Sequence, residues 1–183
     1  MRLKNLIPSV LVALFITTSV FATTTTSKKV VKTNTEETIV GVAVGNKDFS
    51  TLVAAVKAAG LVETLSSTGP FTVFAPTNAA FNKLPEGTVG TLVKKENKEL
   101  LTAILTYHVV AGKFSAKDVV AAIKANKGSF VIKTVQGGNL TATLSNGIVI
   151  LTDVKGNTST VVIADVKASN GIIHAIDSVV MPQ

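Results

Sequence analysis

Hydrophobic and polar positions follow a strand-like period at Phe71–Ala75, where apolar side chains occupy both faces, as in a buried strand. Pro76 cannot continue a strand ladder, and Thr77 is placed to cap a short helix over Asn78–Lys83 with its side-chain oxygen. Phe81 lies where it can fold back from that helix onto the strand. The pattern predicts a strand locked to a helix by capping and aromatic packing, which is a scaffold without a catalytic pair.

Helix-like spacing precedes this unit. The apolar segment Thr38–Val44 predicts a helix that leads to Asp48, and Asp48 is the expected N-cap of the next helix. Gly60 lies where a left-handed residue would end that second helix. Its core-facing side is predicted from apolar residues at i, i+3, i+4 and i+7, namely Phe49, Leu52, Val53 and Val56.

Two more helices are predicted after the central unit. Glu96–Val109 has an apolar stripe that includes His108 near the helix C-terminus, where a protonated imidazole would interact favourably with the helix dipole. Ser115 and Asp118 have the spacing of a capping box and predict a helix over Ala116–Ala125.

From Ser129 onward the chain changes to segments rich in Val, Ile and Thr, which favour strands. Asn146–Gly147 is a strong signal for a type I′ hairpin turn, and Asn157–Thr160 predicts a longer loop. Asn170–Gly171 predicts a tight turn in which glycine supplies a positive φ. The predicted strands are Val131–Val135, Leu140–Leu144, Ile148–Leu151, Val161–Val166 and Ile172–Val180. A helical first half and a β-rich second half predict the α+β class.

Three blocks of this sequence resemble the fasciclin (FAS1) family. They are Phe71–Phe81, the tyrosine–histidine segment Leu101–Val110, and Ala168–Asp177, and they occur in the order in which the family has them. The resemblance implies one fasciclin-like domain over residues 37–183, folded as a wedge of β-sheets with several helices.

The N-terminus has the features of a signal peptide that directs export. Arg2 and Lys4 give a positive region, Leu6–Phe21 is apolar, and Ala22 is a small residue suited to cleavage. We therefore expect a signal peptide over residues 1–22, cleavage after Ala22, and a flexible Thr/Lys-rich linker over residues 23–36. The apolar run is too short and too broken for a typical membrane span. The protein is expected to be secreted, periplasmic or at the cell surface, in a bacterial envelope, with no integral span after cleavage; an uncleaved anchor helix is the alternative.

Charge and composition bear on the partners. The chain has a formal charge of +7, which falls to +5 when Arg2 and Lys4 leave with the signal peptide. Arg2 is the only arginine, Tyr107 is the only tyrosine, and there is no tryptophan. Because nucleic-acid recognition depends largely on arginine forks and exposed aromatic rings, a nucleic-acid partner is not expected. The absence of cysteine means that stability rests on core packing rather than on disulfides.

Candidate chemistry is sparse, and no enzyme activity, cofactor or metal is expected. The two histidines, His108 and His174, lie in apolar surroundings. His174 and Asp177 are three positions apart in a predicted strand, so they do not form a base and its orienting acid. The acidic residues are scattered, whereas a metal site needs three or four convergent ligands. A strongly shifted titration of Asp165 or His108 in a cleft would revive an enzyme hypothesis.

The resemblance implies an extracellular adhesion module that contacts proteins or polysaccharides of a cell surface or matrix, including a biofilm. In animal members an Asp-Ile pair and the Tyr-His segment are implicated in integrin recognition. The matching residues here are Asp165–Val166 and Tyr107–His108, whereas Lys167 replaces a hydrophobic residue. These residues are the adhesion candidates; alternatively, Tyr107 and His108 complete the core and Asp165 bonds a neighbouring turn. A carrier of a small apolar or polymeric ligand is the rival function. The sequence leaves the oligomeric state open.

Overall fold

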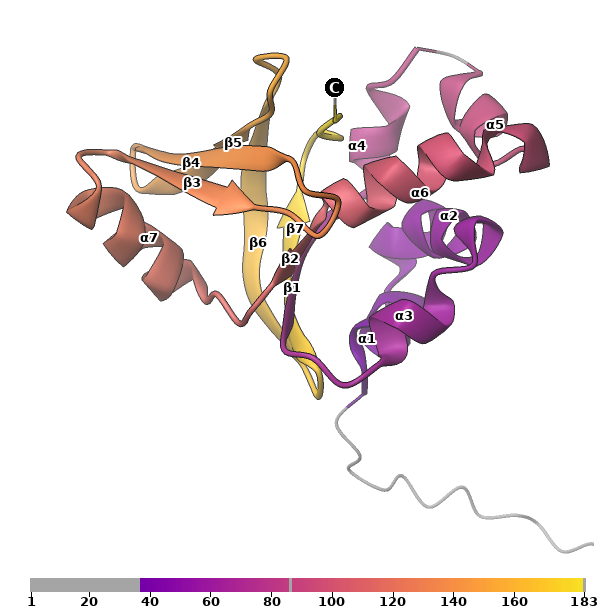
Figure 1. The fold of residues 1–183 in the computed structure, drawn as a ribbon, viewed down its shortest axis with the longest axis horizontal. Helices are drawn as coiled ribbons and strands as arrows, with labels where there is room; N and C mark the ends of the chain where they lie inside the picture. Colours follow the sequence, from indigo (N-terminus) through magenta and orange to yellow (C-terminus); the bar gives the residue numbers. More distant parts are fainter. Residues whose placement is uncertain (1–36, 86, 183) are drawn as a thin grey trace, which may run out of the picture. The chain divides into compact units, whose positions relative to one another are not determined.

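The structure, a computed structural model, describes residues 37–85 and 87–182, which belong to one compact unit (Figure 1). The predicted signal peptide over residues 1–22, its cleavage after Ala22 and the predicted linker over residues 23–36 lie outside the described residues and stay predictions.

Helices dominate the first half of the described chain and strands the second, which confirms the α+β class. The helices are α1 (Ile39–Gly45), α2 (Ser50–Ala59), α3 (Val62–Ser66), α4 (Asn78–Asn82), α5 (Thr88–Leu92), α6 (Lys98–Tyr107) and α7 (Ala116–Ala125), with 3-10 helices η1 (Lys47–Phe49) and η2 (Lys95–Asn97). The strands are β1 (Phe71–Pro76), β2 (Val109–Ala111), β3 (Ser129–Lys133), β4 (Asn139–Ser145), β5 (Ile148–Thr152), β6 (Thr158–Ala168) and β7 (Gly171–Ile176).

The strands form one sheet in the order β2-β1-β7-β6-β5-β4-β3. β1 and β7 run parallel to each other, and the remaining neighbours are antiparallel. A bridge between Val110 and Thr134 brings β2 beside the end of β3, so the sheet almost closes on itself. β7 is buried along its whole length.

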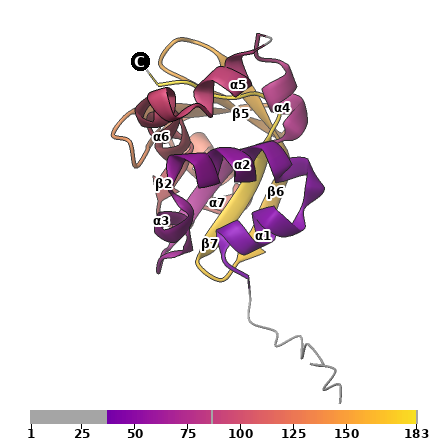
Figure 2. The ribbon, with the colours of Figure 1, turned by 90° about the vertical axis from the view of Figure 1, so that its right-hand side faces the viewer.

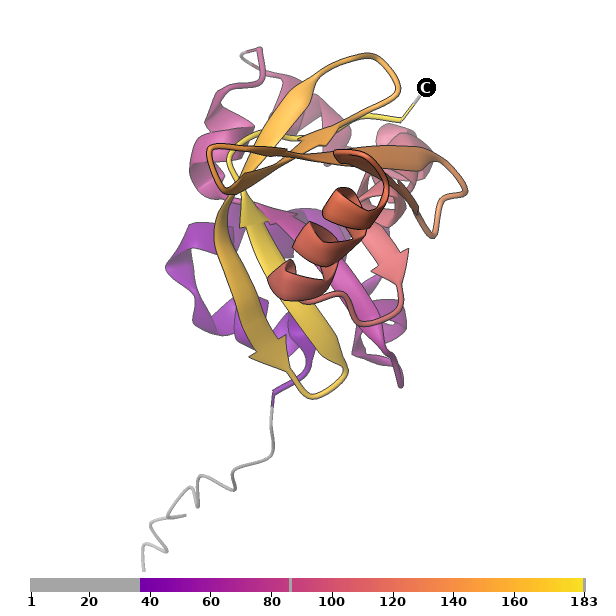
Figure 3. The ribbon, with the colours of Figure 1, turned by 90° about the vertical axis from the view of Figure 1, so that its left-hand side faces the viewer.

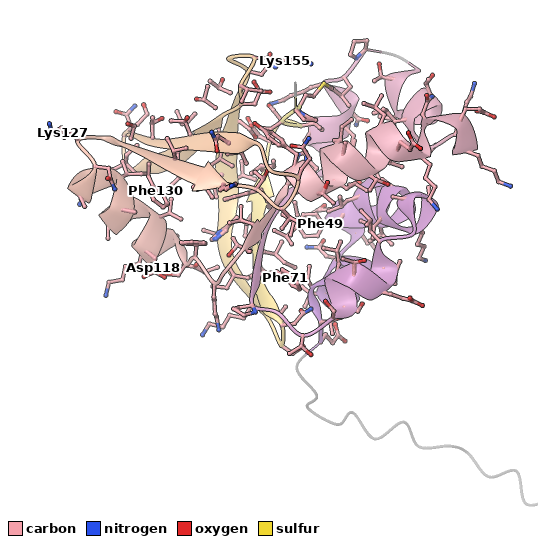
Figure 4. The ribbon with its side chains drawn as sticks, in the orientation of Figure 1. Phe49, Phe71, Asp118, Lys127, Phe130 and Lys155 are labelled. Atoms are coloured by element: carbon pink, nitrogen blue, oxygen red, sulfur yellow. The ribbon has the colours of Figure 1, made fainter. Side chains whose placement is uncertain are left out.

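Two apolar cores lie on opposite sides of β1 and β7. The first packs α1–α6 against these strands and includes Phe49, and the second lies between the strands and α7 and includes Phe74. Figures 1 and 2 show the helices of the first core over β7, and Figure 3 shows α7 on the other side. Figure 4 places Phe49 on the side of α2 and Phe130 beside α7, where its ring centroid is 6.4 Å from that of Phe114.

The central unit has the predicted structure. Five of the six residues of β1 are buried, and Thr77 Oγ1 accepts a hydrogen bond from the Ala80 amide at 3.3 Å. Phe81 is buried in the first core. Pattern, cap and aromatic packing therefore act together in this segment, as the sequence predicts.

Local signals elsewhere are mostly confirmed. Ser115 and Asp118 form the capping box of α7, and Gly60 ends α2 at φ 75°. Asn146–Gly147 has φ values of 51° and 82°, as a type I′ turn requires. The expectation for Asp48 is wrong: the Asn46 side chain caps η1 by accepting from the Asp48 amide at 2.9 Å, and α2 follows directly.

Several predicted element ends are shifted. The segment predicted as one helix over Glu96–Val109 consists of the 3-10 helix η2 followed by α6, and α6 ends at Tyr107. The loop predicted at Asn157–Thr160 instead covers residues before Thr158, because Asp153 Oδ1 accepts from the Lys155 and Asn157 amides and closes the turn there. β7 ends at Ile176 rather than continuing to Val180.

The turn at Asn170–Gly171 forms, but the predicted reason for its glycine is wrong. Gly171 does not have a positive φ. A Cβ there would collide with the carbonyl oxygen of Phe71, so glycine is required by the close approach of β1 and β7. The neighbouring Asn170 side chain accepts from the Ile39 amide at 2.9 Å and donates to the carbonyls of Leu65 and Ser67 at 2.8 and 2.9 Å.

Among residues 37–85 and 87–182, no single helix is long and apolar enough to cross a membrane. One pair of helical segments that meet at 106° is long and apolar enough for a membrane span when the two are counted together, by length and composition alone. The segments are Ile39–Gly45 and Lys47–Ala59.

Replacement of Asn170 tests its role in joining these segments. Asn170→Ala removes three side-chain hydrogen bonds that hold α1 and α3 beside the start of β1, and we expect the free energy of unfolding to fall by about 2–4 kcal/mol. Urea denaturation measures the change. Asn97→Ala removes a single exposed bond to the Thr91 carbonyl and is the matched control, with an expected loss below about 1 kcal/mol. Equal losses in the two variants would contradict the assignment.

Candidate functional site

Tyr107 and His108, at the end of α6, lie inside the domain. Tyr107 is fully buried, and its hydroxyl donates to the Asn139 carbonyl at 2.6 Å. A Cβ at Gly138 would lie 2.6 Å from Cε2 of Tyr107, so the ring packs directly on the turn before β4. Tyr107 therefore joins α6 to the β3–β4 hairpin, and its side chain is not presented to a partner in this structure.

His108 connects α6 to the C-terminal segment. Its Nδ1 lies 2.7 Å from the Ile104 carbonyl, and its Nε2 accepts from the Val180 amide at 3.3 Å. Because a backbone N–H can only donate, Nε2 is unprotonated and Nδ1 carries the proton that bonds Ile104. The side chain is 2% exposed and also borders an apolar cavity of about 30 Å³ beneath α1–α3.

Burial lowers the pKa of His108 from 6.5 to about 4, and the bond to Ile104 offsets only part of that effect. At neutral pH the imidazole is therefore uncharged and lacks the favourable interaction that a protonated ring would have with the helix dipole, because loss of hydration outweighs that attraction. The lowered pKa of His108 results from its burial, and backbone groups already bond both of its ring nitrogens.

Asp165 lies in an irregular part of β6. The register between β6 and β7 shifts between Val161 and Ile163 and again between Ile163 and Val166. Asp165 has φ 60° and is exposed. Its Oδ1 accepts from the Ala116 amide at 2.8 Å, at the start of α7. The bulge therefore turns the carboxylate toward the exposed N-terminus of α7, where negative charge is favourable.

The structure separates the four adhesion candidates. Tyr107 and His108 are buried, Asp165 is exposed, and Val166 is partly buried against the first core. The burial of Tyr107 and His108 agrees with the alternative in which this pair completes the core, whereas Asp165 bonds the first residue of α7 rather than a turn. Asp165 remains as the exposed candidate.

His174 holds the bulge in place. Its Nδ1 accepts from the Asp165 amide at 3.3 Å, so Nε2 carries the proton that bonds the Phe114 carbonyl at 2.8 Å. The ring also stacks on Phe74 of β1, with centroids 5.7 Å apart. One buried imidazole thus ties β6 to the segment that leads into α7. This role of His174 could not be predicted from the sequence, because the bulge that brings Asp165 to His174 is not a local pattern.

Apolar side chains are exposed next to Asp165. Val162 is 53% exposed and Ile163 is 46% exposed. Beyond Thr160, β6 has no strand partner other than β7 among the described residues. Sequence reasoning also missed this surface, although the unbroken apolar run Val161–Ala164 signals a strand that does not alternate in and out.

A cleft lies beneath the same part of β6, between α7 and the beginning of β5. Its volume is about 190 Å³. Val119 and Val120 of α7 form one wall, Ala164 of β6 contributes another, and Phe74 and His174 lie among the residues that line it. The space is apolar and shares its β6 wall with the exposed segment.

The described residues contain no group of three or more His, Cys, Asp or Glu side chains placed to hold a metal ion. Asp177 does not face His174: its carboxylate accepts from the Thr160 amide and forms an ion pair with Lys83 at 3.0 Å. Because His108 and His174 bond backbone groups through both nitrogens, neither is oriented to activate a nucleophile.

The model of the Fasciclin domain family matches residues 47–182. The chain therefore belongs to the fasciclin domain family, whose domain is an adhesion-type module, and the resemblance seen in the three blocks is confirmed. The chain superposes on a solved FAS1 domain pair from the insect cell adhesion molecule Fasciclin I with a TM-score of 0.71 and 21% identity, over 79% of this chain and 51% of that one. This likeness confirms the fold.

Two relatives extend the comparison. The chain is 53% identical over 150 residues to Protein sll1483 of Synechocystis sp., covering 82% of this chain and 76% of that protein. It is 36% identical over 152 residues to the cell surface glycolipoprotein MPB83 of Mycobacterium bovis, covering 80% of this chain and 61% of that protein.

The buried His108 makes stability depend on pH. Between pH 6.5 and about 4 the unfolded chain binds a proton that the folded chain does not, so the free energy of unfolding falls as the pH decreases. The expected loss over this range is about 3 kcal/mol. Urea denaturation from pH 7 to pH 4 measures it, and NMR titration of the His108 ring locates its pKa directly.

His108→Gln is the control because an amide oxygen can still accept from Val180 but does not titrate; its pH dependence is expected to be flatter over this range. Burial raises the pKa values of Asp153 and Asp177, but hydrogen bonds outweigh it and lower both pKa values, with amide donors acting on Asp153 and the Thr160 amide and Lys83 acting on Asp177. Their effect on stability is lost mainly at lower pH. A His108 ring that titrates near 6.5, or identical slopes in wild type and variant, would contradict the account.

Proposed function

We propose that this chain is an exported adhesion module that attaches to a protein or polysaccharide of a cell surface, extracellular matrix or biofilm. Three findings support this function: membership of the fasciclin domain family, similarity to a protein named for its location at the cell surface, and an exposed apolar surface on β6. The exposed surface carries the proposal, because it identifies a face that a partner can reach.

We name this face the β6 edge and define it as Val162, Ile163, Ala164 and Asp165. Each of its residues is exposed, and two are large apolar side chains whose burial by a partner is favourable. Asp165 adds a carboxylate whose second oxygen has no partner among the described residues. Apolar contacts flanked by one oriented polar group are typical of an interface in which a few residues supply most of the affinity.

The two register shifts on β6 indicate how a partner would bind. Bulges interrupt the regular row of backbone donors and acceptors and twist a strand edge away from further pairing. Side-chain contact is therefore favoured over addition of a strand from the partner. This mode also limits self-association through the same edge.

Lysine electrostatics is the competing explanation for any binding. Lys167 follows the β6 edge, and the chain carries an excess of lysine over acidic residues. Attraction that depends on exposed lysines weakens as salt screens it, whereas burial of Val162 and Ile163 is much less sensitive to salt. Salt dependence thus separates a specific contact from a general attraction to anionic polymers.

Binding of the purified protein to an array of polysaccharides, matrix proteins and lipids tests the β6 edge. We expect at least one partner that is retained at physiological salt. Ile163→Ser is expected to weaken that partner about tenfold or more, as for loss of a central apolar contact. Asp165→Asn keeps an oxygen for the Ala116 amide and removes the charge, so it reports on the carboxylate separately.

Val131→Ser is the matched control, since Val131 is 57% exposed on β3 and lies outside the β6 edge. It is expected to change affinity by less than about twofold, and exposed changes of this kind alter the free energy of unfolding by roughly 0.5 kcal/mol or less. Equal weakening by both serine variants, or binding that disappears at physiological salt, would contradict the proposal.

A further inference from the structure

The cleft beneath α7 arises because β5 and β6 separate. Their pairing covers three residue pairs and stops at Ile150 and Thr160. Past that point Ile148 and Val149 border one side of the cleft, while Val161 and Ala164 border the other. Ala116, Val119 and Val120 of α7 also line this space.

The buried end of the cleft offers no free polar side chain among the described residues. His174 is 2% exposed and stacks on Phe74 with an angle of 27° between the rings. Its two nitrogens are already bonded to the Asp165 amide and the Phe114 carbonyl. The other residues that line the cleft are glycine, alanine, valine, isoleucine and phenylalanine, and within the described chain they include no charged side chain. A ligand in this space gains affinity from apolar contact and aromatic packing.

The cleft is open to solvent on one side, and its volume indicates the size of the group that it can enclose. An apolar cavity of about 150 Å³ is large enough to hold benzene, and the cleft measures about 190 Å³. The cavity bordered by His108 measures about 30 Å³, which suits no more than a water-sized group. Ligand binding is therefore assigned to the cleft beneath α7 and not to the interior of the first core.

We propose that this cleft binds a free, uncharged small molecule built on a single aromatic ring. Entry is between Ile148, which is 48% exposed, and Ala164, which is also exposed. Inside, the ring of the ligand meets the Phe74–His174 pair and the valine side chains of α7 and β5. Such a site would allow the protein to carry a small apolar ligand, which is the rival function named from the sequence. The site does not depend on the adhesive role of the β6 edge.

The cleft and the β6 edge share Ala164, and His174 of the cleft bonds the Asp165 amide. A bound ring would therefore alter the environment of Asp165 without contacting its carboxylate. This link predicts a specific spectroscopic signature, because the Asp165 amide is expected to respond together with the residues that line the cleft.

Titration of the purified protein with fluorobenzene tests the site. We expect saturable binding by fluorine NMR with a dissociation constant of roughly 1 mM or below, within what so few atoms can supply. In nitrogen-labelled protein, the amide shifts are expected at Ala116–Val120, Gly147–Val149 and Val161–Asp165. Shifts spread over the surface without saturation, or centred on α1–α3, would overturn the proposal.

Ala164→Phe fills the cleft from an exposed position and is expected to weaken fluorobenzene binding at least tenfold. Val120→Phe fills it from the opposite wall, so the test does not depend on one variant folding. Ala121→Phe is the matched control, because Ala121 is exposed on α7 and does not line the cleft; its affinity is expected to stay within twofold of wild type. Folded filling variants that bind fluorobenzene as wild type does would overturn the proposal.

Discussion

The close approach of β1 and β7 beside Asn170 is the constraint on which the rest of the structure depends. Gly171 allows the two backbones to meet, and the Phe71 amide donates to the Asn170 carbonyl at 3.1 Å. The Asn170 side chain then binds backbone groups of α1 and α3. Since β7 is buried on both sides, this junction fixes the strand against which both cores pack.

The same strand positions the surface that we propose as functional. His174 on β7 bonds the bulge of β6 and the segment before α7, so one buried residue positions both the β6 edge and the cleft. Tyr107 and His108 have a comparable supporting role on the other end of the sheet, through Asn139 and Val180. In this account the sequence blocks that identify the family mainly build the scaffold, and the contact surface lies on the bulged strand between them.

A structural feature could be predicted from the sequence when the residues that cause it lie close together along the chain. The capping box of Ser115 and Asp118 was predicted because its partners are three residues apart, and the cap at Thr77 was predicted for the same reason. The glycine at position 171 was given the wrong cause, because the obstructing carbonyl belongs to a strand a hundred residues earlier. The uncharged state of His108 could not be inferred from the sequence, because its burial depends on tertiary packing. The bulge at Asp165 and the cleft result from strand register, which no short segment specifies.

The measurement that tests this account most directly separates stability from attachment in one pair of variants. Tyr107→Phe and Ile163→Ser are compared in the free energy of unfolding and in affinity for the partner that wild type retains at physiological salt. The account predicts that Tyr107→Phe lowers the free energy of unfolding by about 0.5–1.5 kcal/mol through loss of the hydrogen bond to the Asn139 carbonyl and leaves affinity unchanged in the folded protein. Ile163→Ser is predicted to do the reverse. Loss of affinity in folded Tyr107→Phe, with Ile163→Ser binding normally, would contradict the account.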